Sequence, residues 1–203
     1  MHEKDVLLEG LKKRGFDSKV IDAFSRVKRE NFVPDRLIGY EYEDISLPLA
    51  EGSTISQPST IAFMLNLLDL HQGQKVLEIG SGSGYTLALI SEIIKNGKIY
   101  GLEKVQSLAI KSKKLLSKDS NIEVINRDGY EGLMLYGPYD RIIASAAYDK
   151  KPYHLLEQLK DSGILVAPVH QMIIQMKKEK GILYEKEFPG FVFVPMIREH
   201  KED

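Results

Sequence analysis

The sequence contains no cysteine. Disulfides, cysteine-based zinc sites and thiolate nucleophiles are therefore excluded. The histidines are few, and none is spaced from another as metal ligands usually are: His2, His71, His154, His170 and His200. We therefore expect no bound metal.

The chain also lacks a long apolar run and an excess of charge of one sign. Its 28 basic and 29 acidic residues give a formal net charge of -1, so no global field attracts nucleic acid. The lysines at 111–118 are expected to form a solvated helix face. The N-terminal residues 1–5 are mostly charged, which is unlike a signal peptide. We expect a cytoplasmic monomer that binds neither membranes nor nucleic acid.

The sequence contains enough hydrophobic residues to form the core of one globular domain. Hydrophobic residues make up 43 % of 203 residues, so residues 1–203 are expected to form a single domain. Apolar spacing predicts helices at 4–14, 18–27 and 59–69. The stretch 31–58 between them is too long for a simple connector, which favours a functional loop. Residues 1–73 thus form a helical and loop region before the core at 74–203.

From residue 74 onward, short apolar strands alternate with helices. Strands are predicted at 75–79, 98–103, 122–126, 140–145 and 163–168, and helices at 84–95, 105–117 and 152–160. Antiparallel strands are predicted after them, at 172–178, 183–188 and 191–197. This order predicts an α/β fold, a doubly wound and mainly parallel Rossmann-like sheet with antiparallel strands at its end.

A glycine-rich loop, Glu78-Ile79-Gly80-Ser81-Gly82-Ser83-Gly84, joins the first of these strands to its helix. Such a loop can be an ordinary tight turn. Its G-x-G-x-G spacing differs from the G-x-G-x-x-G of dinucleotide sites, since Tyr85 stands at the last glycine position. A carboxylate at Glu78 would repel a pyrophosphate but suits a zwitterionic amino-acid cofactor. The loop therefore favours S-adenosylmethionine over NAD, with Glu78, Gly80, Ser81, Gly82 and Gly84 as candidate contacts.

Acidic residues close to the ends of the next two strands complete the predicted cofactor site. Glu103 is placed to accept hydrogen bonds from ribose hydroxyls, as acids do at this strand end. Asp128, followed by Gly129, is placed to reach the adenine edge. Asp140, at the start of the fourth strand, is expected to have a structural role.

The second candidate feature is the polar segment Gly52-Ser53-Thr54-Ile55-Ser56-Gln57-Pro58, just before a predicted helix. From the residues alone, Ser56 or Ser59 could simply cap that helix.

Several motifs together resemble the protein-L-isoaspartate (D-aspartate) O-methyltransferase family over about residues 3–197. They are Arg29-Glu30-Asn31-Phe32-Val33-Pro34, Leu47-Pro48-Leu49, Thr54-Ile55-Ser56-Gln57-Pro58, Val76 to Tyr85, Arg127-Asp128-Gly129, Tyr139-Asp140-Arg141-Ile142 and Phe193-Val194-Pro195. The resemblance implies methyl transfer from S-adenosylmethionine to the free α-carboxylate of L-isoaspartyl residues in damaged proteins.

The resemblance also implies roles for individual residues. Ser56 matches the active-site serine, and Thr54, Ser56 and Gln57 match the substrate-side segment. Thr54 and Ile55 lie over the cofactor in the family, and Glu103, Asp128 and Gly129 match its cofactor-binding positions. The product of the cofactor would be S-adenosylhomocysteine.

The sequence departs from the family near these motifs. Ala50 and Ser53 replace the usual glycine and glutamine beside the substrate loop, which puts peptide preference in question more than chemistry. Lys151 replaces an isoleucine, and His170 replaces a glycine in a loop expected near the substrate cleft. Two rival functions remain at this point: a methyltransferase with another acceptor, such as a modified peptide, small molecule or RNA, and a non-enzymatic cofactor-binding relative.

Overall fold

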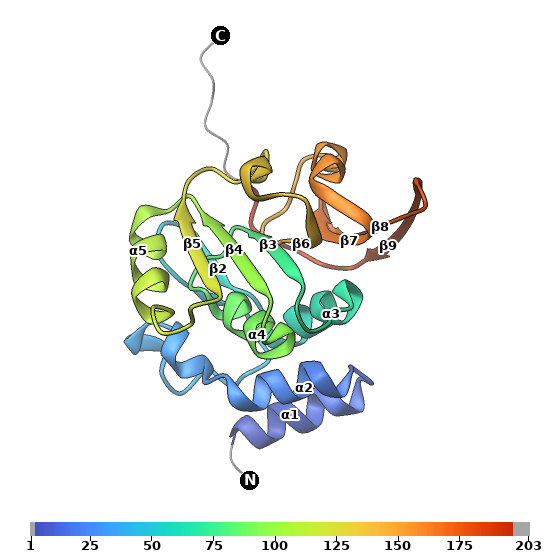
Figure 1. Ribbon diagram of the computed structural model, residues 1–203. Coiled ribbons are helices and arrows are strands. Elements are labelled where there is room, and N and C mark those ends of the chain that lie inside the picture. The colour runs from blue at the N-terminus through green and yellow to red at the C-terminus, as the bar shows by residue number, and fades with distance from the viewer. Residues whose placement is uncertain (1–2, 197–203) are drawn as a thin grey trace.

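The computed structural model describes residues 3–196 (Figure 1). The α-helices are α1 Glu3–Lys13, α2 Ser18–Arg26, α3 Pro58–Leu68, α4 Tyr85–Ile94 and α5 Gln106–Leu115. The 3₁₀ turns are η1 Arg29–Phe32, η2 Asp35–Leu37, η3 Met134–Tyr136 and η4 Tyr153–Gln158. A two-stranded hairpin, β1 Leu47–Pro48 and β2 Thr54–Ile55, precedes the main sheet.

The main sheet has the strand order β5-β4-β3-β6-β7-β8-β9. Its strands are β3 Lys75–Ile79, β4 Lys98–Glu103, β5 Ile122–Asn126, β6 Tyr139–Ala144, β7 Leu159–Val169, β8 Met172–Glu179 and β9 Ile182–Pro189. Pairing is parallel from β5 to β7 and antiparallel from β7 to β9. The predicted Rossmann-like methyltransferase sheet is confirmed. Its strand order reverses between β3 and β6, where ligands of open α/β sheets bind.

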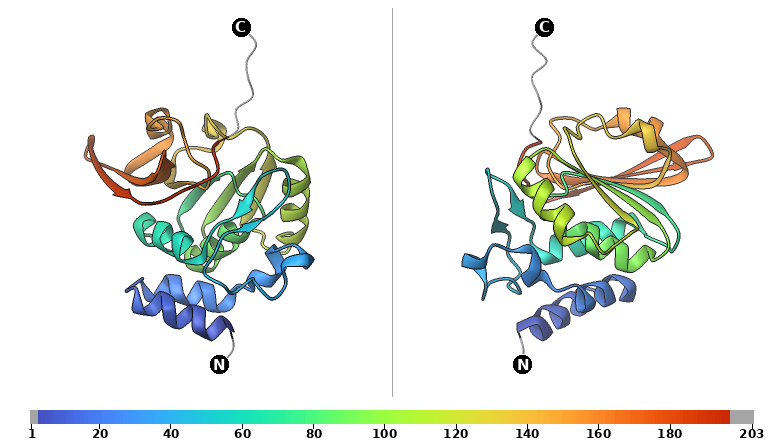
Figure 2. Two further views of the ribbon diagram at one scale, coloured as in Figure 1. Left: turned by 180° about the vertical axis from the view of Figure 1, so that it is seen from behind. Right: turned by 60° about the vertical axis from the view of Figure 1, so that its left-hand side comes forward.

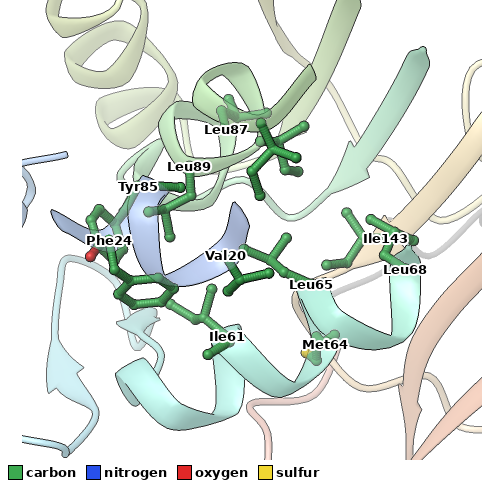
Figure 3. Close-up of a cluster of buried hydrophobic side chains, with 14 of the residues drawn as sticks. Val20, Phe24, Ile61, Met64, Leu65, Leu68, Tyr85, Leu87, Leu89 and Ile143 are labelled. Atoms are coloured by element: carbon green, nitrogen blue, oxygen red, sulfur yellow. The ribbon is translucent and has the colours of Figure 1, made fainter. Parts of the chain in front are cut away.

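The helices form layers on one face of the sheet. α3 and α4 pack directly on the strands, and α1 and α2 lie beneath them (Figures 1 and 2). Figure 3 shows the buried contact, where Val20 and Phe24 of α2 meet Leu65 of α3 and Leu89 of α4. One cluster of buried side chains extends from Leu7 to Ile173, so the N-terminal helices and the sheet share a core.

The start of α3 is fixed by residues far apart in the sequence. Pro58 occupies its first turn, where the missing N–H removes no helical bond. Gln57 is the N-cap residue and makes no side-chain cap bond, while the carboxylate of Asp44 accepts the N–H of Ser59 at 2.8 Å. The alternative that Ser56 or Ser59 only caps this helix is therefore not supported, because a loop carboxylate takes that place.

Two predictions were wrong near the C-terminus. The helix expected at 152–160 is the short 3₁₀ turn η4, and β7 begins directly after it at Leu159. The strand expected at 191–197 is not formed over the described residues 191–196, where only Pro195 makes an isolated bridge, to Ala147; position 197 lies outside the described residues. The segment crosses back towards the sheet instead of extending it.

Candidate active site

A cavity of about 210 Å³, which we call the cofactor cavity, opens at the carboxyl ends of β3, β4 and β6. The glycine loop forms one wall, and the β1–β2 hairpin covers it. Leu49 of the hairpin lies close enough to touch a side chain at Gly82, at 3.7 Å from an added Cβ. The members of the predicted cofactor site that line this cavity are Thr54, Gly80, Gly82, Glu103, Asp128 and Gly129. Sequence motifs more than 70 residues apart are thus brought to one place.

Glu103 is the buried acid of this cavity, with 6 % of its surface exposed. One carboxylate oxygen accepts the N–H of Gly82 at 2.6 Å, and the other accepts the N–H of Val105 at 2.8 Å. Burial raises the pKa of Glu103, and the backbone N–H groups of Val105, Gly82 and Lys104 oppose that rise. A carboxylate has about four lone-pair sites, so acceptor capacity remains for ribose hydroxyls.

Glu78, at the end of β3, lies deeper than Glu103. Its Oε1 accepts a hydrogen bond from the hydroxyl of Ser145 at 2.7 Å. Its Oε2 is buried and forms no hydrogen bond of good geometry within residues 3–196, although Thr86 lies close enough to lower the pKa of Glu78 slightly. The buried hydroxyl of Ser81 also lacks a partner among these residues. Burial raises the pKa of Glu78 to about 8, and the nearby charge of Glu103 adds to the rise. Both groups line a small cavity of about 30 Å³ that also touches Thr54, so unpaired polar atoms here fit the amino-acid end of a cofactor.

The glycines of the loop divide into two kinds. Gly80 and Gly82 line the cofactor cavity, and their φ angles of 77° and 52° are left-handed. Gly84 lies outside the cavities described here, because it is the N-cap residue of α4 and faces α5. A Cβ at Gly84 would lie 2.8 Å from Leu116. The structure thus gives Gly84 a packing role against α5, and its contact with the cofactor stays a prediction.

Ser56 lines a second cavity of about 260 Å³, together with Gln57, Thr60 and the segment 192–194. Its hydroxyl forms no hydrogen bond with any of the residues that the structure describes. The side chain is half-buried, so the hydroxyl can reach a ligand. Thr54 and Ser145 line this cavity, the small cavity at Glu78 and the cofactor cavity. The three spaces therefore meet at these two hydroxyl side chains, and a ligand in one can touch a ligand in another.

A buried arginine holds the segment that carries Ser56. Arg29, with none of its surface exposed, donates from Nη2 to the carbonyl oxygens of Ile45, at 3.3 Å, and Ser56, at 3.1 Å. Its guanidinium lies 5.6 Å from the ring centre of Tyr85, at the start of α4. Burial lowers the pKa of Arg29. Tyr85 itself packs in the core against Phe24 and Phe32 and borders the small cavity at Glu78.

The remaining predicted residues are distributed as follows. Ile55 is buried beside the small cavity. Asp128 forms an ion pair with Lys104 at 3.4 Å, and both residues line the cofactor cavity. Asp140 accepts the N–H of Lys75 at 2.7 Å and pairs with Lys160, which is the structural role expected for it.

Ser145 is a site residue that the motifs did not identify. It directly follows β6, and the available signal was its position at the carboxyl end of a parallel strand. Val194 to Met196 were also missed as lining residues of the cofactor cavity, because they come from a segment predicted as strand.

Two of the family departures lie away from the cavities. His170 stands at the β7–β8 turn with a φ of 52°, a left-handed position that suits the usual glycine. Lys151 pairs with Glu185 at 2.6 Å and Glu187 at 2.8 Å on β9. Ala50 and Ser53, by contrast, flank the tip of the hairpin over the cofactor cavity. His170 lines none of the cavities described here, so the expected effect on the substrate cleft has no support.

Within residues 3–196, no group of three or more histidine, aspartate or glutamate side chains could hold a metal ion. The same residues include no helix long and apolar enough to cross a membrane.

The parallel sheet, the glycine loop after β3 and the buried acid at the end of β4 define the class of S-adenosylmethionine-dependent methyltransferases. A family model for protein-L-isoaspartate(D-aspartate) O-methyltransferase matches residues 2–201. The chain belongs to this family.

Similar proteins support that assignment. A protein-L-isoaspartate O-methyltransferase of Methanosarcina mazei is 43 % identical over 204 residues, covering 97 % of this chain and 84 % of the relative. One from Dictyoglomus turgidum is 38 % identical, covering 98 % and 93 %.

Solved structures agree with the sequence relatives. A protein-L-isoaspartate O-methyltransferase superposes with a TM-score of 0.86 at 29 % identity; the match covers 95 % of this chain and 65 % of that longer one. A relative from Plasmodium falciparum, described as a protein-L-isoaspartate O-methyltransferase in complex with S-adenosyl-L-homocysteine, gives 0.82 at 25 % identity, covering 96 % and 98 %.

Replacing Glu103 by alanine is expected to weaken cofactor binding by about 1–3 kcal/mol, since charged hydrogen bonds are lost. Titration calorimetry measures this directly. Glu123→Ala is the matched control, because Glu123 is a carboxylate on the adjacent strand β5 that pairs with Lys98 outside the cavity. Unchanged affinity in the Glu103 variant would remove the ribose assignment.

Proposed function

We propose that this chain transfers the methyl group of S-adenosylmethionine to the free α-carboxylate of L-isoaspartyl residues in damaged proteins. The observation that carries the proposal is the unengaged hydroxyl of Ser56, in a cavity that meets the cofactor cavity at Thr54 and Ser145. S-adenosylmethionine can therefore lie in the cofactor cavity while the substrate carboxylate lies in the cavity at Ser56.

The residues present suit a reaction that needs no general base. The bound cofactor supplies an electrophilic methyl group on a positively charged sulfur. A substrate carboxylate is already ionised near pH 7, so its oxygen can form the new O–CH₃ bond as the S–CH₃ bond breaks, with that electron pair remaining on sulfur. Catalysis then depends on placing two reactants in line and excluding water.

In this proposal, Ser56 donates a hydrogen bond to one carboxylate oxygen and leaves the other directed at the methyl group. Thr54 and Gln57 complete the substrate side, and Thr54 and Ile55 cover the cofactor. Glu78, Gly80, Ser81, Gly82, Glu103, Asp128 and Gly129 hold the cofactor itself. In the ester formed, the neighbouring backbone amide nitrogen can attack the carbonyl carbon and expel methanol, a far better leaving group than the oxygen of a carboxylate. Succinimide formation and its hydrolysis by water can therefore follow without the enzyme.

The expected result of the direct test is methyl transfer from labelled S-adenosylmethionine to an isoaspartyl peptide and none to the same peptide with a normal aspartyl residue. The two peptides differ only in which carboxylate is free, so the aspartyl form controls for sequence. Cofactor binding without transfer to either peptide would point to another acceptor on the same scaffold. Absence of cofactor binding would favour a non-enzymatic relative.

We also propose that residues 1–203 act as one domain and as a monomer, in the cytoplasm and without a nucleic-acid partner. Support comes from the near-zero net charge, which attracts no nucleic acid, and from the core that the N-terminal helices share with the sheet. Light scattering at assay concentration should give a mass near 23.0 kDa. A mass of twice that value would reject the monomer.

A further inference from the structure

A large groove lies on the N-terminal side of the molecule, between α1 and the segment Tyr42–Ile45. Its volume is about 550 Å³, compared with about 260 Å³ for the cavity at Ser56. We call it the α1 groove. Apolar or small residues form its walls: Val6, Leu7, Gly10, Leu11, Tyr42 and Ile45.

The α1 groove exposes apolar surface to solvent. Val6 is 56 % exposed and Ile45 is 44 % exposed, on opposite walls. Between them Gly10 leaves the helix without a side chain, and a Cβ added there would meet no atom within 4 Å. Concave apolar surface with a polar rim is typical of binding sites, and here Glu3, Glu43 and the Arg14–Asp44 ion pair form the rim.

The α1 groove is continuous in the chain with the Ser56 cavity. Ile45 lines the groove, and the next residue, Ser46, lines the cavity. Asp44 on the groove side accepts the N–H of Ser59, in the first turn of α3. Arg29 binds the carbonyl oxygens of both Ile45 and Ser56, so the two sites are fixed to each other by one buried side chain. An extended peptide advances about 3.3 Å per residue, so one chain can leave the cavity and follow this segment.

We propose that the α1 groove binds an apolar side chain of the substrate polypeptide, located a few residues from the isoaspartyl residue. This inference rests on the function proposed above and adds a preference to it. The occupant is the substrate chain itself, because consecutive residues, Ile45 and Ser46, line the groove and the cavity for the modified residue. Isoaspartyl residues flanked by leucine or a similar side chain are then methylated at a lower substrate concentration than isoaspartyl residues with polar flanks.

Gly10 offers a direct test. Gly10→Trp fills the α1 groove from within the helix, and Gly10→Ala is the matched control, since alanine favours the helix and leaves the groove open. Three isoaspartyl peptides are compared: a short one with a single flanking residue on each side, a long one with leucines in flanks of about six residues, and the same long one with serines.

The wild-type protein should show a KM about tenfold lower for the leucine peptide than for the serine peptide, as expected for burial of one apolar side chain. Gly10→Trp should raise the KM for the leucine peptide to that for the serine peptide, with kcat retained. The KM for the short peptide should stay within about twofold in all proteins. Gly10→Ala should behave as wild type.

Equal KM values for the two long peptides in the wild-type protein would overturn the inference, as would a leucine preference that survives in Gly10→Trp. Failure of the wild-type protein to methylate any of the three peptides would instead reject the proposed function, and the inference with it. If Gly10→Trp unfolds at a lower temperature than Gly10→Ala, Val6→Lys on the same wall provides a second variant. It must also abolish the leucine preference.

Discussion

Replacing Ser56 by alanine is expected to lower kcat about a hundredfold and to leave cofactor affinity nearly unchanged. The reason is geometric. Loss of the hydroxyl frees the substrate carboxylate to rotate away from the methyl group, and removal of one positioned donor in an active site typically costs about 10²–10³ in rate. Single-turnover methylation of an isoaspartyl peptide measures the loss, and calorimetry with the cofactor measures the affinity.

Ser59→Ala is the matched control for this experiment. Ser59 also loses one hydroxyl at the start of α3, but it is buried at 5 % exposure and lines none of the cavities described here. Because the cap of α3 is the carboxylate of Asp44, a fall in activity of Ser56→Ala has no simple explanation as loss of a helix cap. Full activity in Ser56→Ala would remove the hydroxyl from the mechanism.

The parallel half of the sheet was predicted closely from the sequence. The strands at 75–79, 98–103 and 122–126 have the predicted bounds. β3 and β4 are buried along nearly all of their length, as parallel strands with largely apolar sequences are, whereas β5 is an edge strand with only Val124 buried. The segment at 191–197 has a similar apolar composition but pairs with no neighbouring strand over its described part. Phe191 stacks on Phe63 at 5.2 Å and Val192 is 86 % exposed, so its residues pack one by one on other elements. Composition alone does not distinguish these two outcomes.

The candidate site was predicted where a motif implied both a position and a ligand. Strand-end position was enough to bring Glu103 and Asp128 to one cavity with the glycine loop. Contacts that depend on tertiary structure could not be predicted from the sequence. They include the hydrogen bond from the hydroxyl of Ser145 to Glu78 and the one from Arg29 to the carbonyl oxygen of Ser56. The packing role of Gly84 was hidden for the same reason, since Leu116, which it faces, lies 32 positions along the chain.

Glu78 should make the stability of the ligand-free protein fall as pH rises. The folded protein keeps the proton of Glu78 up to a pKa of about 8, whereas the unfolded chain releases it above its ordinary value of 4.5. The unfolded state therefore binds fewer protons between these values, and the free energy of unfolding decreases by about 1.4 kcal/mol per pH unit in that window. Glu78→Gln lacks this contribution. The midpoint temperature of thermal unfolding should thus fall less steeply from pH 5 to pH 8 in the Glu78→Gln variant than in the wild type.

Cofactor binding should reverse the protonation of Glu78. A cationic amino group beside the unpaired Oε2 favours the carboxylate, so binding at pH 7 is expected to release up to about one proton and to strengthen as pH rises towards 8. Calorimetry in two buffers of different ionisation enthalpy counts the protons. The amino group of the cofactor titrates in both proteins, so the difference between wild type and Glu78→Gln isolates Glu78. Equal proton release in the two would mean that Glu78 stays protonated and serves as a hydrogen-bond donor, because its carboxyl group then remains neutral beside the ligand.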